Sequence, residues 1–161
     1  MPPNPNKKNY RLADMSMPPD EAVPYPDPDE TADFRTDRIE MAELGTILHV
    51  REWQGQDGLV EQFALMLNVT PAHAAYSRCQ KLKGEQPNFE QVRRTDTWHS
   101  SVHSHQYFID CSDSDRYVHE HLSGGVEEEK SRRVVHGTFQ EHYYKMLYPF
   151  DYLECWEAGK P

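Results

Sequence analysis

Residues 127–157 read EEEKSRRVVHGTFQEHYYKMLYPFDYLECWE, and this stretch carries the clearest structural pattern in the chain. Val135, Phe139, His142 and Met146 recur at the spacing of one helix face, which predicts a long helix from about Glu127 to Leu147. Proline disfavours helical geometry in the residue before it, so Pro149 ends that helix. The aromatic residues that follow predict a short second helix docked on a core.

Apolar spacing upstream of this stretch predicts further helices. We interpret residues 59–67 as a short helix and residues 72–82 as an amphipathic helix that follows an N-cap at Thr70 and closes at Gly84. A third helix has one stripe formed by Trp98, Val102, His105 and Ile109, and a short helical piece continues through Leu122. The run from residue 41 to 53 has no assigned state. No segment stands out with the period of a strand, so the sequence favours an all-α fold.

The N-terminal segment has a different composition. Eight of the 12 prolines lie in residues 2–28, where they remove backbone donors and favour extended geometry. Two interpretations stay open: a disordered acidic tail, or an extended arm that wraps a partner. The anchors of such an arm would be Tyr10, Tyr25 and Phe34.

Charge and hydropathy limit the classes of function. The chain has 161 residues, 37% of them hydrophobic, and a net charge of -10. A surplus of acidic residues argues against nucleic-acid binding, because phosphates must be neutralised by lysine and arginine, and it allows a basic partner. The longest apolar run, FALMLNV at residues 63–69, is too short for a membrane span. The N-terminus lacks the apolar core of a secretory signal. Acidic residues follow its basic ones, which argues against a cleaved transit peptide, so any import into an organelle would be non-cleaved.

Candidate chemical groups are mostly histidines. Cys79, Cys111 and Cys155 are odd in number and widely spaced, which predicts neither a disulfide framework nor a CxxC site. A metal-binding enzyme or chaperone is one alternative, because several histidines fall close together in the sequence. No ligand signature matches their spacing, and we expect no catalysis and no cofactor. The histidines of this alternative are His99, His103, His105, His119 and His121.

The C-terminal segment resembles cytochrome c oxidase subunit VIb, a small peripheral subunit with a coiled-coil-helix-coiled-coil-helix fold. In that family, two facing helices carry Cys-x9-Cys and Cys-x10-Cys, and the last cysteine is followed by Pro and, seven residues later, Trp. Here Gly137 and Tyr148 occupy the second pair of positions, and Pro149 and Trp156 follow at the family spacing. On the first helix, Cys111 keeps the x9 frame with Ser101.

The resemblance implies an antiparallel helical hairpin that lacks its disulfides. In the family's register Ser101 faces Tyr148 and Cys111 faces Gly137, and Cys155 is too far from Cys111 to bond with it. The positions that match the family pattern are Ser101, Cys111, Gly137, Phe139, Tyr144, Lys145, Leu147, Tyr148, Pro149, Tyr152 and Trp156. Candidate interface residues are Tyr10, Tyr25, Phe34, Phe150, Tyr152 and Trp156.

The resemblance also implies a function and a domain organisation. Residues 1–34 would form the arm, 35–96 a helical extension and 97–161 the subunit VIb-like hairpin. The chain would then be a non-catalytic accessory subunit of mitochondrial cytochrome c oxidase, peripheral on the intermembrane-space side of the inner membrane. Its partners would be other oxidase subunits and cytochrome c, with membrane contact only through the complex. A further alternative is an unrelated helical accessory subunit of another large assembly.

Overall fold

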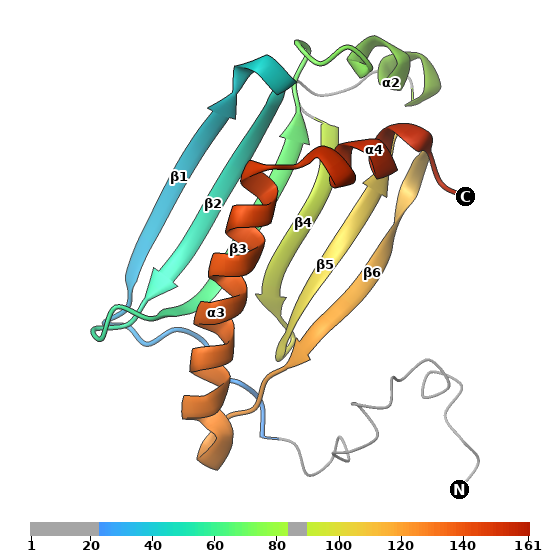
Figure 1. The fold of residues 1–161 in the computed structure, drawn as a ribbon. Coiled ribbons are helices and arrows are strands. Elements are labelled where there is room, and N and C mark those ends of the chain that lie inside the picture. Colours follow the sequence, from blue (N-terminus) through green and yellow to red (C-terminus); the bar gives the residue numbers. More distant parts are fainter. Residues whose placement is uncertain (1–22, 84–89) are drawn as a thin grey trace, which may run out of the picture.

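The chain folds into one antiparallel sheet covered on one face by helices, as Figure 1 shows. The structure is a computed structural model and describes residues 23–83 and 90–161. Within these residues, six strands follow one another in sheet order: β1 (Asp33–Met41), β2 (Thr46–Gln54), β3 (Val60–Val69), β4 (Glu90–Trp98), β5 (Ser101–Phe108) and β6 (Cys111–His121). The helices are α2 (Tyr76–Lys83), α3 (Glu128–Leu147) and α4 (Phe150–Ala158), with 3-10 turns η2 (Ala42–Leu44) and η3 (Gly125–Glu127).

The hydrophobic core lies between the sheet and helices α3 and α4. α3 crosses β3, where Phe139 meets Phe63 edge to face with ring centroids 5.3 Å apart. α4 packs on β4 and β5, and the indole of Trp156 is fully buried. We call the opposite face of the sheet, which faces away from α3 and α4, the open face.

The prediction of an all-α helical hairpin is wrong, and so is the helix assigned to residues 59–67, which form part of β3. The stripe from Trp98 to Ile109 lies on strands β4 and β5 and ends in the turn that follows β5, and the segment through Leu122 belongs mainly to β6. Strand alternation was hidden because polar side chains are buried: the row of β5 that faces the helices runs Val102, Ser104, Gln106, Phe108. Because two of these four buried residues are polar, the alternation of apolar and polar residues that identifies a strand is lost in the sequence. In the segments that were wrongly predicted to be helical, the β-branched and aromatic residues favour strands.

The predicted long C-terminal helix is confirmed as α3, within one residue at its start. Pro149 separates it from α4, as the sequence indicates. The predicted helix at residues 72–82 is α2, which begins later, at Tyr76, and its predicted closure at Gly84 lies outside the described residues.

The facing pairs of the expected hairpin are absent among the described residues. Ser101 lies on β5 and Cys111 on β6, which are adjacent antiparallel strands. The Leu122 N–H donates to the carbonyl of Ser100, so Ser101 lies near the start of α3, whereas Tyr148 follows its end. Twenty helical residues span about 30 Å, so Ser101 and Tyr148 do not face each other. Cys79, Cys111 and Cys155 form no disulfide with one another.

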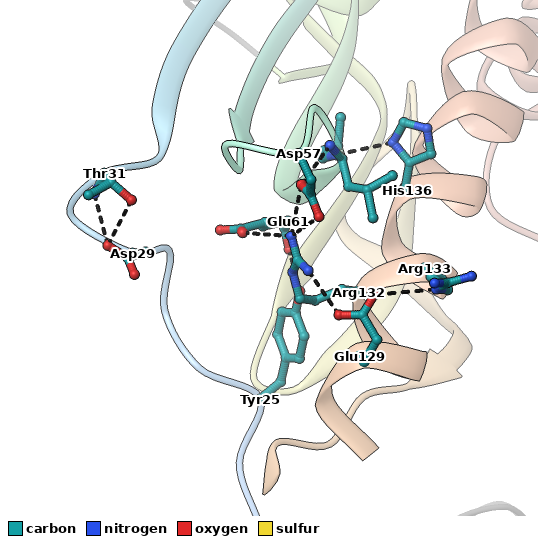
Figure 2. Close-up of polar contacts among 11 residues, drawn as sticks. Tyr25, Asp29, Thr31, Asp57, Glu61, Glu129, Arg132, Arg133 and His136 are labelled. Atoms are coloured by element: carbon teal, nitrogen blue, oxygen red, sulfur yellow. Dashed lines mark hydrogen bonds and ion pairs between the residues drawn. The ribbon is translucent and has the colours of Figure 1, made fainter. Parts of the chain in front are cut away.

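A polar cluster around Arg132 fastens the start of α3 to the β2–β3 hairpin, as Figure 2 shows. The guanidinium of Arg132 lies 2.9 Å from Asp57, 3.1 Å from Glu61 and 3.0 Å from Glu129. One turn further along α3, His136 Nδ1 accepts a hydrogen bond from the Val60 N–H at 3.1 Å. The cluster therefore fixes the direction in which α3 crosses the sheet.

Residues 23–28 run across the same end of the sheet. The Tyr25 hydroxyl donates to the carbonyl of Glu61, and the Tyr25 N–H donates to Ser100 Oγ at 2.9 Å. Gln62 Nε2 donates to the carbonyl of Pro26. This part of the predicted arm is thus bound to the chain's own sheet. The rest of that prediction, residues 1–22 with Tyr10, lies outside the described residues.

Candidate ligand site on the open face of the sheet

The open face is hollowed at its centre to form a depression of about 810 Å³. Strand register explains the hollow, because Arg51, Ala64, Asp96 and His103 are successive cross-strand neighbours on β2 to β5. The alanine in the middle of this row has only a methyl group, so larger neighbours form walls around it. Ala64 is the floor of the site.

Three arginines and one aspartate are the charged groups that line the depression: Arg51, Arg94, Arg116 and Asp96. The Arg51 guanidinium lies 5.6 Å from the ring of Phe34 and 5.8 Å from that of Trp53, which are cation–π distances. The Arg94 Nε donates to Asp96 Oδ2. Among the described residues, Arg51 and Arg116 have no carboxylate at ion-pair distance. The site is therefore locally cationic in an acidic chain.

Aromatic side chains form the walls of the site. Trp53 and Phe34 stack at a tilt with centroids 4.7 Å apart, and Trp98 is 58% exposed at the end of β4. His105 stands between His103 and Tyr107 on β5, with its ring perpendicular to that of His103. Flat hydrophobic surfaces with cations beside them suit a planar anion.

The floor continues into a polar line formed by Asp96, His103 and Ser101, all at most 5% exposed. His103 Nε2 lies 3.1 Å from Asp96 Oδ1, and His103 Nδ1 lies 3.0 Å from Ser101 Oγ. The contact between the ring and the carboxylate is at ion-pair distance but lacks the direction of a hydrogen bond. Asp96 Oδ1 accordingly has no hydrogen-bond partner among the described residues.

Burial determines the charge of the histidines in this site. Burial lowers the pKa of His103, and the nearby Asp96 carboxylate only partly offsets it. Burial also lowers the pKa of His105 and raises that of the Tyr107 hydroxyl. All three groups are therefore neutral near pH 7.

A tight turn shapes one edge of the depression. His99 and Ser100 both have positive φ, 55° and 56°, and they join β4 to β5 as a two-residue hairpin loop. Residues other than glycine uncommonly adopt this backbone conformation. The hydrogen bond from the Tyr25 N–H to Ser100 Oγ braces the turn, which carries Trp98 at its base.

Most of the residues named from the sequence lie elsewhere. Phe34 borders the open face, and Tyr25 anchors the arm beside it. Trp156 and Pro149 are buried in the core, and Tyr152 lies under the guanidinium of Arg93 at 4.3 Å. The remaining family-pattern and interface residues on the helices are not brought together with the site: Gly137, Phe139, Tyr144, Lys145, Leu147, Tyr148 and Phe150.

The histidines of the metal alternative are split between the two faces of the sheet. His103 and His105 line the depression, whereas His119 stacks on His142 of α3 with centroids 4.5 Å apart. Within the part of the chain that the structure describes, no group of three or more His, Cys, Asp or Glu side chains could hold a metal ion.

Sequence reasoning missed the arginines and tryptophans of the site. Arg51 and Trp53 on β2 are two residues apart, and so are Arg94, Asp96 and Trp98 on β4. This two-residue spacing of large polar and aromatic side chains is the signal that could have found them, because it places each set on one face of a strand.

No protein-family model, no curated protein and no solved structure matches this chain. None of the helices in the described residues is long and apolar enough to cross a membrane.

Proposed function

We propose that the open face binds a small anionic ligand that carries a planar or aromatic group. The observation that carries the proposal is the hollow above Ala64, which is bordered by Trp53 and Trp98. Two arginines of its lining, Arg51 and Arg116, have no ion-pair partner among the described residues. A concave, partly apolar site with a few convergent polar groups is typical of small-molecule binding.

The charges favour an anion. The guanidinium of Arg51 lies over the adjacent rings of Phe34 and Trp53, so it is positioned before any ligand arrives. Arg116 of β6 stands across the depression, beside His105 in the sheet register. A carboxylate, sulfonate or phosphate can accept hydrogen bonds from such guanidinium groups. The net charge of -10 disfavours a long polyanion but leaves a small one free to enter.

Fluorescence titration with anilinonaphthalene sulfonate tests the proposal, because this dye joins fused aromatic rings to one anionic group. We expect saturable binding, weakened about tenfold by Arg51→Gln or Arg116→Gln, since a hydrogen bond to a charged group contributes about 1.5 kcal/mol. Arg35→Gln is the matched control, because Arg35 lies on β1 next to Phe34 and pairs with Asp33. The uncharged parent dye should bind at least about tenfold more weakly. Equal affinities for both dyes and all variants would refute the proposal.

The accessory role in cytochrome c oxidase, at the mitochondrial inner membrane with oxidase subunits and cytochrome c as partners, stays a prediction. The acidic charge is compatible with it. The resemblance depended on two facing helices. The first of them, which would carry Ser101 and Cys111, is replaced by strands β5 and β6. We therefore base no site or interface on it.

A further inference from the structure

Asp96 is the most deeply buried charged group of the depression, with a side chain only 7% exposed. One carboxylate oxygen, Oδ2, accepts a hydrogen bond from the Arg94 Nε. The other, Oδ1, has no hydrogen-bond partner among the described residues. A buried carboxylate oxygen without a donor is costly, so its presence at the floor of a ligand site calls for a role.

The hydrogen bonds around His103 assign its proton. The Ser101 hydroxyl donates its single proton to the carbonyl of Trp98 at 3.1 Å. With its proton used in this way, Ser101 Oγ accepts from His103, and we assign the proton of the neutral ring to Nδ1 from this hydrogen-bond pattern. The other ring nitrogen, Nε2, is left with a lone pair 3.1 Å from Asp96 Oδ1. Two proton acceptors thus stand side by side without a proton between them.

We propose that Asp96 and His103 together accept a proton from the bound ligand, which makes the open face a catalytic site. This inference rests on the proposed function, because the ligand must first occupy the depression. It departs from the expectation, drawn from the sequence, that the chain has no enzymatic activity. A proton on the Asp96 carboxylate would lie beside the lone pair of Nε2, 3.1 Å away, and rotation of one of the two side chains would align them for a hydrogen bond.

The surroundings point to proton removal from a carbon next to a carbonyl group. In this step the C–H bond breaks, its electron pair forms the C=C bond of an enolate, and the proton goes to the Asp96 carboxylate. The negative charge that develops on the carbonyl oxygen is stabilised by the guanidinium groups of the wall, such as Arg94. The proton on Asp96 then exchanges with water, and return of a solvent-derived proton, or of a deuteron in D2O, to the same carbon completes the exchange with water as the only other reactant. The substrate class is an aromatic 2-oxo acid, whose carboxylate suits the arginines and whose ring suits Trp53 and Trp98.

Deuterium exchange tests the inference. Phenylpyruvate is the probe, incubated in D2O with the full chain, and loss of its benzylic C–H signal is followed by proton NMR. We expect exchange at least about a hundredfold faster than in buffer alone, the usual gain from a positioned general base. Binding of the same probe is measured separately by quenching of tryptophan fluorescence.

Variants assign the reaction to these residues. Asp96→Asn should return exchange to the buffer rate while phenylpyruvate still quenches the fluorescence, and His103→Asn should slow exchange at least about tenfold. The control Asp113→Asn removes an exposed carboxylate of β6 outside the depression and should exchange like the unmodified chain. Binding without accelerated exchange in the unmodified chain would overturn this inference and leave the proposed function intact. Absence of phenylpyruvate binding would overturn this inference, while the titration with anilinonaphthalene sulfonate decides the proposed function separately.

Discussion

Ala64 of β3 lies directly opposite Asp96 of β4 in the sheet register, so a methyl group adjoins a buried carboxylate. The small side chain leaves the space above it, and the carboxylate supplies the polar edge of that space. Together they give the open face both its shape and its chemistry.

Filling the hollow should abolish ligand binding. Ala64→Leu adds three carbon atoms above the floor, into space that the ligand needs, so we expect at least about a tenfold loss of affinity for anilinonaphthalene sulfonate. The control Ala42→Leu makes the same change at an exposed position of η2 and should leave affinity unchanged. Unaltered affinity in Ala64→Leu would place the dye elsewhere.

Truncating the tryptophan of α4 should destabilise the fold. Trp156 is fully buried and meets the ring of His73 edge to face at 5.5 Å, so Trp156→Ala leaves a large cavity. We expect the free energy of unfolding in urea to fall by about 3–5 kcal/mol. Phe150→Ala on the same helix removes a side chain that is 58% exposed, and should cost less than about 1 kcal/mol. Similar small losses in both variants would argue that Trp156 serves an interface instead of the core.

Acidification should weaken the fold before the carboxylates titrate. Burial lowers the pKa of His142 to about 4 and also lowers that of His103. An unfolded histidine has a pKa of about 6.5, so below this pH the unfolded chain binds protons that the folded chain refuses. The free energy of unfolding should therefore fall as pH drops from about 6.5 toward 4, by at most about 1.4 kcal/mol per pH unit for each histidine.

Urea unfolding at about pH 7, 6 and 5 measures this slope. His142→Phe should reduce the slope, because the substitution removes a buried ring whose Nδ1 lacks a hydrogen-bond partner among the described residues. His121→Phe changes an exposed histidine and should keep it. A slope that is the same in all three proteins would show that His142 does not control the acid response.

Breaking the cluster at the start of α3 should loosen the helix. Arg132→Met leaves Glu61, 15% exposed, and Asp57 without their cation, and we expect a loss of about 1–2 kcal/mol in unfolding free energy. Arg133→Met removes a neighbouring arginine that is 75% exposed, and should cost less than about 0.5 kcal/mol. Amide hydrogen exchange should quicken in the first turns of α3 in Arg132→Met only. If the amides of the first turns of α3 exchanged equally slowly in both variants, Arg132 would not be the residue that fastens the start of α3.

The sequence predicts the helices better than the sheet because α3 has a clear apolar stripe and a proline stop. Its residues Val135, Phe139, His142 and Met146 face the core or lie against it. The strands are harder to recognise because buried Ser104, Gln106 and Thr95 find hydrogen-bond partners only after folding. A polar side chain whose hydrogen bonds are made to a neighbouring strand can be buried, but from the sequence alone it is predicted to be exposed.

The site could be predicted only in part for a related reason. His103 and His105 stood out as candidate chemical groups, but their neighbours Arg94 and Asp96 come from another strand. Ala64, which creates the hollow, carries no chemical signal at all. The depression arises from the register of four strands, and no local spacing encodes that register.

The most direct test of ligand binding on the open face is an NMR titration of the three indole N–H signals with anilinonaphthalene sulfonate. Trp53 and Trp98 border the depression, whereas Trp156 is buried beneath α4 on the other side of the sheet. We predict that the signals of Trp53 and Trp98 shift with one common saturation curve while that of Trp156 stays in place. A shift confined to Trp156, or none in all three signals at saturating dye, would contradict the account.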